Sequence, residues 1–263
     1  MLRTLPLIAL VALAACGGGS RDAAPAVASN EITVISSNFD DSDPTDWPGR
    51  SPDRYAVHGI DLSRFQTAVD WGQARANGVN FAFIKATEGG DRVDPMFQDH
   101  WRGAARAGVM RGAYHFFYHC RPAAEQARWF IRHVPKTPGA LPPVLDMEWT
   151  PTSPTCTLRR DGATIRSEAR IFIDILERHY GQRPMIYTTV DFFQDTELWR
   201  LQGVEFWLRS VADHPHGAYD GSAWSFWQYT STGLVPGVAG PVDINVFAGS
   251  KQGWSDWLAA RRL

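Results

Sequence analysis

The sequence contains no long apolar run, no cluster of basic residues and no common metal-binding motif. Its apolar stretch near the start, residues 5–13, is too short to cross a bilayer as a helix. Because the net charge is −2 and no basic cluster stands out beyond Arg261-Arg262, we expect no nucleic-acid partner. His115 and His119 have no third ligand at a recognisable spacing, so we expect no metal and no other cofactor.

The first sixteen residues are typical of an export signal. Arg3 supplies the positive start, an apolar stretch follows, and Leu13-Ala14-Ala15-Cys16 resembles the bacterial lipoprotein box. We therefore expect residues 1–16 to be a lipoprotein signal peptide and Cys16 to be lipidated. The alternative is an ordinary signal cleaved at its small residues, with Cys16 incidental. A lipid anchor on Cys16 predicts an exported protein of the cell envelope; if the bacterium is Gram-negative, we expect it in the outer membrane or periplasm.

The sequence divides into a low-complexity segment and one domain. Residues 17–53 are rich in Gly, Ala, Ser, Pro and Asp, which predicts a flexible tether. Residues 54–263 are more apolar and can bury a full core, and a single α/β barrel normally uses about 250 residues. No internal repeat at a solenoid period is present.

Strand and helix patterns alternate through the predicted domain. Apolar, β-rich runs occupy residues 57–62, 81–86, 110–118, 142–148, 184–189, 204–210, 224–230 and 241–247. Helical spacing occurs in residues 97–105, 127–134 and 165–180. The alternation predicts a parallel sheet, and eight strands predict closure into a barrel. The last two connections are too short for a crossover helix, so the barrel should be irregular near its end.

Two carboxylates stand at the end of the fourth predicted strand. In an extended segment, Asp146 and Glu148 project to the same side, about 6–7 Å apart at the backbone. Like charges this close raise the pKa of one carboxyl, so one group can stay protonated while the other is ionised. Hydrolysis of a glycosidic bond needs this division of roles. The alternative is that both acids cap a following turn.

Further acids occupy corresponding positions on other strands. Asp61 ends the first predicted strand and Asp243 lies in the eighth. Closure of the barrel would bring Asp61 beside Asp243, across the mouth from the pair on the fourth strand. Singly, Asp61 could cap a helix and Asp243 could be a turn residue. Together, four acids at strand ends indicate a catalytic site.

Seven segments, in order and spacing, resemble the family 25 glycoside hydrolases, the Chalaropsis-type lysozymes. The resemblance covers about residues 55–250. Its segments are Gly59-Ile60-Asp61-Leu62-Ser63, Phe83-Ile84-Lys85-Ala86-Thr87-Glu88-Gly89, Gly112-Ala113-Tyr114-His115-Phe116, Asp146-Met147-Glu148, Ile186-Tyr187-Thr188, Trp227-Gln228-Tyr229 and Val242-Asp243-Ile244-Asn245.

The resemblance implies a fold and an activity. The fold is a single-domain, irregular and flattened (β/α)5β3 TIM-like barrel. The activity is that of an N-acetylmuramidase, which cuts the β-1,4 bond after N-acetylmuramic acid in peptidoglycan. Glu148 is implied as the general acid, and Asp146 as the nucleophile or as the group that steadies attack by the substrate's own acetamido oxygen. Asp61 and Asp243 would support them.

The same resemblance implies the substrate-binding residues and leaves rival functions open. The implied residues are Tyr114, Phe116, Tyr187, Trp207, Trp227 and Gln228. One rival is a hydrolase of chitin-like N-acetylglucosamine polymers, and the other is a wall-binding lipoprotein without catalysis. We expect a monomer whose partner is the peptidoglycan glycan strand.

Two pairs of residues beside the predicted site have structural interpretations. Lys85 and Glu88 are expected to form an ion pair. Cys120 follows the third predicted strand and Cys156 the fourth, so both lie in neighbouring loops on the catalytic face. In an exported protein this placement favours a disulfide over two free thiols.

Overall fold

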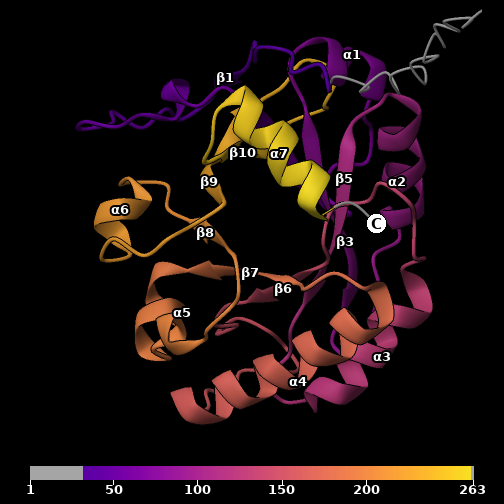
Figure 1. Ribbon diagram of the computed structural model, residues 1–263, viewed down its shortest axis with the longest axis vertical. Helices are drawn as coiled ribbons and strands as arrows, with labels where there is room; N and C mark the ends of the chain where they lie inside the picture. The colour runs from indigo at the N-terminus through magenta and orange to yellow at the C-terminus, as the bar shows by residue number, and fades with distance from the viewer. Residues whose placement is uncertain (1–31, 262–263) are drawn as a thin grey trace, which may run out of the picture. The chain divides into compact units, whose positions relative to one another are not determined.

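Eight strands close into a barrel in the computed structural model, which describes residues 32–261 (Figure 1). They are β2 (His58–Leu62), β3 (Phe81–Glu88), β5 (Met110–Phe116), β6 (Val144–Met147), β7 (Met185–Thr189), β8 (Phe206–Arg209), β9 (Phe226–Leu234) and β10 (Val242–Phe247). Neighbouring strands from β2 to β9 run parallel. Strand β10 runs antiparallel to both β9 and β2 and closes the ring. The eight predicted strands and their closure are confirmed.

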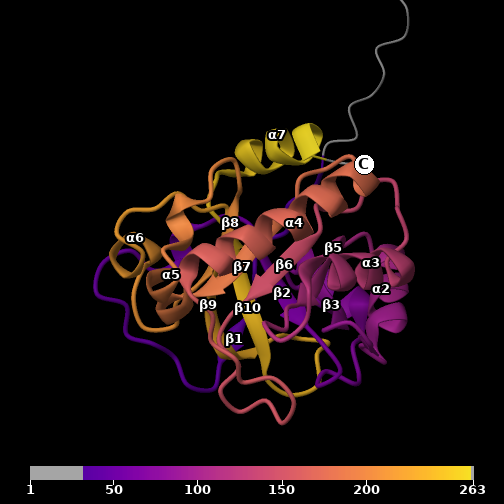
Figure 2. The ribbon, with the colours of Figure 1, turned by 90° about the horizontal axis from the view of Figure 1, so that it is seen from below.

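Five helices follow the first five barrel strands. They lie outside the strands in Figure 1, and Figure 2 shows the last four of them from below. The five helices are α1 (Trp71–Ala76), α2 (Phe97–Arg106), α3 (Ala123–His133), α4 (Gly162–Tyr180) and α5 (Val190–Asp195). Between β8 and β9 the described chain forms only the four-residue helix α6 (Pro215–Ala218), and no helix separates β9 from β10. Helix α7 (Lys251–Arg261) follows β10. The predicted arrangement of five β/α units followed by three strands is confirmed.

The longest helix begins and ends at residues that favour those positions. The side chain of Asp161 accepts a hydrogen bond from the backbone N–H of Thr164 at 3.0 Å, which caps the first turn of α4. Gly181 ends the helix with φ at 76°, a left-handed conformation that glycine adopts without a steric cost. These two ends fix the helix after β6, and the loop before it belongs to the catalytic face.

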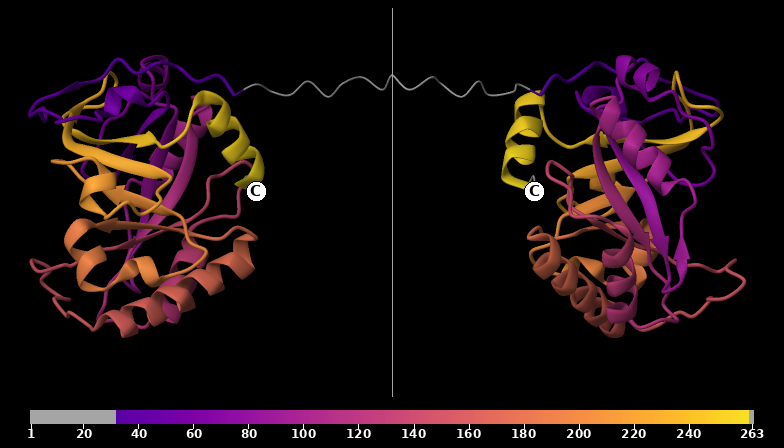
Figure 3. Two further views of the ribbon diagram at one scale, coloured as in Figure 1. Left: turned by 60° about the vertical axis from the view of Figure 1, so that its left-hand side comes forward. Right: turned by 90° about the vertical axis from the view of Figure 1, so that its right-hand side faces the viewer.

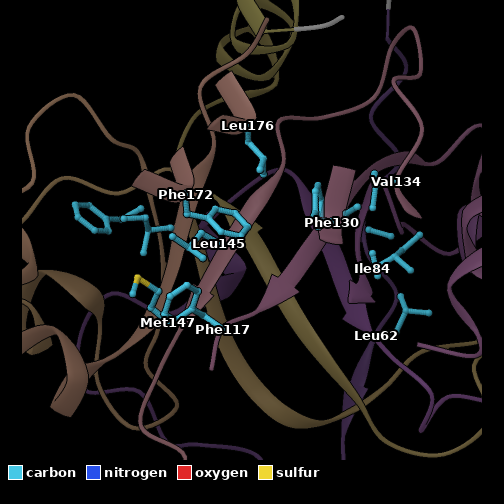
Figure 4. Close-up of a cluster of buried hydrophobic side chains, with 14 of the residues drawn as sticks. Leu62, Ile84, Phe117, Phe130, Val134, Leu145, Met147, Phe172 and Leu176 are labelled. Atoms are coloured by element: carbon cyan, nitrogen blue, oxygen red, sulfur yellow. The ribbon is translucent and has the colours of Figure 1, made fainter. Parts of the chain in front are cut away.

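Buried apolar residues form two layers. The outer layer lies between the strands and the helices, where Leu145 of β6 lies beside Phe172 of α4 (Figure 4), whose ring centre is 6.4 Å from that of Phe130 of α3. The inner layer fills the barrel and includes Phe81, Phe83, Tyr114, Val144, Met185, Tyr187, Trp207, Phe226, Phe247 and Trp254. Gly59 makes room for this packing, because a Cβ there would come within 2.6 Å of the Phe81 ring.

Residues 32–53 lie against the barrel, so the predicted tether over residues 17–53 is wrong for this part. Ile35 and the side chain of Asn80 exchange two hydrogen bonds, 2.9 and 2.8 Å long. The short strand β1 (Asp40–Asp41) pairs antiparallel with the end of β9. Ile32 and Val34 pack against the inner apolar layer. Composition suggested a free coil, but backbone pairing and this apolar patch fix the segment along the outside of the barrel (Figure 3).

Three further short elements lie outside the barrel strands and the main helices. Single turns of 3-10 helix span Pro52–Arg54 and Leu198–Arg200, and strand β4 (Arg92–Val93) pairs with β3. The predicted signal peptide and Cys16 lie outside the described residues. Within residues 32–261, no helix is both long and apolar enough to cross a membrane.

Candidate active site

The four predicted carboxylates lie at one end of the barrel. Asp61 in β2 and Asp243 in β10 are directly paired across two antiparallel strands, as barrel closure predicted. Asp146 lies in β6, and Glu148 follows one residue after that strand ends. Asp61 and Asp146 are each 5% exposed, whereas Glu148 and Asp243 are half-buried. The alternatives of a helix cap for Asp61 and a turn for Asp243 are wrong.

Asp61 is held by two amide side chains. Its Oδ2 atom accepts hydrogen bonds from Gln228 Nε2 at 2.7 Å and from Asn245 Nδ2 at 2.8 Å. These amides are oriented in turn, because Tyr187 Oη donates to Gln228 Oε1 and Trp207 Nε1 donates to Asn245 Oδ1. Burial raises the pKa of Asp61 to about 6, although both amides favour its ionised form. Asp61 is therefore a rigidly placed carboxylate.

Asp146 has a buried oxygen without a protein partner. Its Oδ1 atom has no hydrogen-bond partner within the described part of the chain. Burial, followed by the nearby charge of Glu148, raises the pKa of Asp146 well above its ordinary value. Buried polar atoms are normally hydrogen-bonded, so an orphan acceptor in a site is a place where a substrate group can donate.

Glu148 and Asp243 titrate close to neutral pH. Burial raises the pKa of Glu148 to about 7, although the positive charges of Arg209 and Lys85 act against this shift. Burial and then the charge of Asp61 raise the pKa of Asp243 to about 8. A carboxyl that titrates near 7 and is partly open to solvent can serve as a general acid and then as a base.

Two cations face these acids, and one of them was not predicted. Arg209 of β8 is paired in register with Gln228 of β9, whose side chain reaches Asp61 inside the barrel. Residues in register share a face, so Arg209 also points into the mouth. Its charge favours the ionised forms of Asp61, Glu148 and Asp243. In the sequence, the inward orientation of Arg209 was indicated only by its position two residues after Trp207 in the same strand.

The second cation is already paired. Lys85 Nζ lies 2.7 Å from Glu88 Oε2, which confirms the predicted ion pair, and 4.4 Å from the centre of the Phe116 ring. Phe116 is partly exposed beside it. The predicted substrate residues Tyr114 and Tyr187 are 9% and 7% exposed, respectively. Burial raises the pKa of both phenols well above the ordinary value, so both remain hydrogen-bond donors.

Two predicted substrate residues are not available to a ligand. Trp207 is 1% exposed and lies too deep in the barrel interior. Trp227 is fully buried because it precedes Gln228 in β9, and successive residues of a strand point to opposite faces. With Gln228 facing inward, Trp227 faces outward, where rings of Trp47 and His214 lie 5.1 Å from its own. The prediction that both tryptophans bind substrate is wrong.

Cysteine and histidine side chains support the loops around the site. Cys120 and Cys156 form a disulfide with their Cα atoms 5.7 Å apart, which confirms that prediction. His115 is buried and hydrogen-bonded to Thr87 Oγ1 at 2.7 Å, and His119 is bonded to the carbonyl of Glu148. No group of three or more possible metal ligands gathers anywhere in residues 32–261.

Comparisons with known proteins agree with this geometry. The family model "Glycosyl hydrolases family 25" matches residues 60–238. The uncharacterized protein YegX of Escherichia coli K12 is 36% identical over 206 residues, which make up 76% of this chain and 73% of that protein. Lysozyme M1 of Streptomyces globisporus is 34% identical over 216 residues, with 75% and 70% covered.

Solved structures share the fold. A family 25 glycosyl hydrolase from Bacillus anthracis matches with a TM-score of 0.70 and 32% identity, over 79% of this chain and 95% of that one. A bacterial lysozyme from Streptomyces coelicolor matches with a TM-score of 0.68 and 31% identity, over 78% and 97%. The family model covers the strands that carry Asp61 and Asp146 and the position of Glu148, whereas Asp243 lies five residues beyond its end. The chain therefore belongs to the glycosyl hydrolases family 25 and is a glycoside hydrolase.

Proposed function

We propose that this glycoside hydrolase is an N-acetylmuramidase that cleaves the β-1,4 bond between N-acetylmuramic acid and N-acetylglucosamine in peptidoglycan. Relatives named lysozyme and N,O-diacetylmuramidase support the substrate class. The observation that carries the proposal is the pair at the end of β6. Glu148 has a pKa raised to about 7, and Asp146 beside it has a buried oxygen to which no group in residues 32–261 donates.

Glu148 is the general acid in this proposal. Below a pH of about 7 its carboxyl is protonated and can give a proton to the leaving glycosidic oxygen. Once ionised, the same carboxylate removes a proton from the water that completes hydrolysis. Because the acid must be protonated at the start, turnover should decline as the pH rises through about 7.

Asp146 acts on the other side of the scissile bond. In a substrate-assisted route, the 2-acetamido oxygen attacks the anomeric carbon while its N–H donates to Asp146. In a direct route, the Asp146 carboxylate itself attacks that carbon. Both routes retain the anomeric configuration. The orphan Oδ1 atom favours the substrate-assisted route, because an acetamido N–H would satisfy it.

The decisive experiment is mass spectrometry of the soluble products from purified peptidoglycan treated with the full chain. The wild type should release fragments with reducible muramic-acid ends, and Glu148→Gln should release none while keeping its fold and its binding. Binding to peptidoglycan without release by the wild type would contradict catalysis. Cleavage of N-acetylglucosamine oligomers in preference to peptidoglycan would contradict the muramidase assignment.

We also propose that Cys16 carries a lipid and anchors the enzyme to a membrane of the cell envelope. The support is the sequence Leu13-Ala14-Ala15-Cys16 after a short apolar stretch. Cells fed a clickable fatty acid should label the wild type and leave Cys16→Ala unlabelled. Wild-type protein without label would contradict the anchor. Light scattering of the detergent-solubilised enzyme should give the mass of a monomer, and a dimer would contradict that expectation.

A further inference from the structure

Glu148 begins the loop after β6, and three contacts join this loop to the loop after β5 or close it on itself. His119 Nε2 donates to the Glu148 carbonyl at 3.0 Å. Thr150 Oγ1, two residues after Glu148, donates to the Cys156 carbonyl at 2.6 Å. The disulfide then joins Cys156 to Cys120, the neighbour of His119. We call the disulfide, His119 and Thr150 the loop brace. It holds the segment around Glu148 from both sides.

The barrel itself does not fix Glu148. Strand β6 ends at Met147, so the catalytic acid lies just beyond the ladder of strand hydrogen bonds. Asp146, two residues earlier, lies within that ladder, and its carbonyl accepts from the N–H of Phe117 at 3.0 Å. The sheet therefore places Asp146, whereas the Glu148 carbonyl beyond the strand is held by the bond from His119.

The environment of the His119 ring fixes which of its nitrogens donates a hydrogen bond. Its ring is 2% exposed and is stacked on Phe192, with the ring centres 5.2 Å apart. Burial lowers the pKa of His119, so the ring is neutral at neutral pH. Its Nδ1 atom has no partner within the described residues, and the bonded atom faces a carbonyl. The proton must then be on Nε2, because a carbonyl can only accept.

We propose that the loop brace positions the carboxyl of Glu148 for proton transfer, so that the disulfide is part of the catalytic apparatus and not only a source of stability. The proposal rests on the role of Glu148 as the general acid. Proton transfer requires the acid within hydrogen-bond reach of the leaving oxygen, so small displacements of its backbone are costly. His119, Thr150 and the two cysteines are positioning residues, since none of them has to touch substrate.

The proposal implies control by thiol chemistry. Cys120 is an exposed residue and Cys156 is 2% exposed, so an external thiolate would approach the disulfide from the side of Cys120. Dithiothreitol would supply two electrons and two protons, close to its own cyclic disulfide and leave two cysteine thiols. The loops would then be joined only by non-covalent contacts, and Glu148 could move toward solvent.

The first test uses the full chain with Cys120→Ala and Cys156→Ala combined. On soluble, uncross-linked glycan strands we expect kcat to fall about tenfold to a hundredfold while KM changes little. Dithiothreitol should give the wild type the same loss and leave the double variant unchanged. Lower thermal stability alone, with unchanged kcat below the unfolding range, would overturn the proposal.

The second test isolates His119. His119→Ala should lower kcat as the cysteine variant does, whereas His119→Gln should restore much of it, because the glutamine amide can donate from the place of Nε2. His133→Ala is the matched control, since the His133 ring also bonds to a backbone carbonyl, that of Trp129, at 2.8 Å within helix α3. Equal activity of His119→Ala and His133→Ala would overturn the proposal.

The third test does not depend on turnover and separates this proposal from the proposed function. The pKa of Glu148 can be measured by carbon NMR of labelled glutamate carboxyls, with Glu148→Gln assigning the signal. Because burial raises this pKa, release of the loop should lower it toward the ordinary value of 4.5. The charged groups around Glu148 are Arg209, Lys85, Asp191, Asp61, Asp146 and Asp243, and the brace variants keep all of them. An unchanged pKa would overturn the proposal even if the natural substrate were another glycan.

Discussion

The two ends of the barrel interior differ in chemistry although the same strands line both. On β3 the inward positions run from Phe81 and Phe83 to Lys85, and on β8 from Trp207 to Arg209. The closed end is an aromatic floor, a set made up of Phe81, Phe83, Phe226, Phe247 and Trp254. The open end carries the four acids. Each of these parallel strands therefore supplies stability at its start and function two residues later, whereas the antiparallel β10 carries Asp243 near its start and Phe247 of the floor at its end.

This contrast shows where the fold gains and loses free energy. Burial of aromatic side chains in the floor is favourable and leaves no polar atom of those rings to satisfy, except the Trp254 Nε1 atom. In the mouth, burial raises the pKa values of all four acids, so their ionisation is opposed by the fold. The apolar floor and the outer layer stabilise the barrel and offset the free-energy cost of burying these acids.

Asp146→Asn should reduce the difference between the two ends, because it replaces a buried ionisable group of the mouth with a neutral amide. Turnover should fall about 10³-fold, because neither a nucleophile nor a charged partner for the acetamido group remains. Stability should respond in the opposite direction. A raised folded-state pKa favours the folded state below the unfolded value, and this contribution is lost as the pH rises toward the folded value.

The amide variant has no such titration, so it should unfold at a higher temperature than the wild type at pH 8 and at about the same temperature at pH 4. Thermal scans at both pH values, with turnover measured at pH 6, check the two effects. The matched control is Asp99→Asn on the exposed face of α2, which should change neither quantity. A wild type that is more stable than Asp146→Asn at pH 8 would contradict the contrast.

Phe226→Ala changes the aromatic floor and should lower stability without lowering turnover. Phe226 is fully buried in the floor, with the rings of Phe81 and Phe83 each 5.0 Å away. Loss of the ring leaves a cavity, so the free energy of unfolding should fall by about 3–5 kcal/mol. The kcat of the folded fraction at low temperature should change little. Urea unfolding measures the first quantity, and a large fall in kcat at full foldedness would show that floor and mouth are not separable.

The sequence predicted those parts of the site that follow from strand periodicity. Asp146 and Glu148 are two residues apart, and barrel closure brings Asp61 beside Asp243, so both neighbourhoods could be inferred without coordinates. The same rule shows why one prediction failed. Trp227 and Gln228 are adjacent in a strand, so both could not face the mouth.

Contacts between segments far apart in the chain could not be predicted. The bond from His119 to the Glu148 carbonyl joins residues 29 apart, and the pairing of Ile35 with Asn80 joins residues 45 apart. Neither has a local pattern, since a histidine in a loop and a polar low-complexity segment each fit many structures. Arg209 was missed for a related reason, because one arginine at a strand end forms no motif until its neighbours are placed.

Asn80→Ala tests whether residues 32–53 add to the stability of the floor. The Asn80 side chain is 3% exposed and bonds both backbone groups of Ile35. Its removal leaves these groups unpaired and should lower the free energy of unfolding by about 1–3 kcal/mol, with little change in kcat. Asn38→Ala is the control, because its exposed amide bond to Asn77 should contribute at most about 0.5 kcal/mol. Equal effects of the two variants would show that the segment is only loosely held.

Arg209→Met makes the smallest change and tests the balance of charge in the mouth. The Arg209 charge favours the ionised forms of Asp61, Glu148 and Asp243, so its loss should raise the pKa of each. Both limbs of the pH profile depend on these carboxyls, since some must be ionised and the general acid must be protonated. The profile of kcat/KM should therefore shift to higher pH. Turnover at pH 6 should fall about fivefold, because less of the required carboxylate is present. Arg209→Lys keeps the charge and should stay near the wild-type profile, whereas a profile that Arg209→Met leaves in place would mean that this cation does not act on the acids.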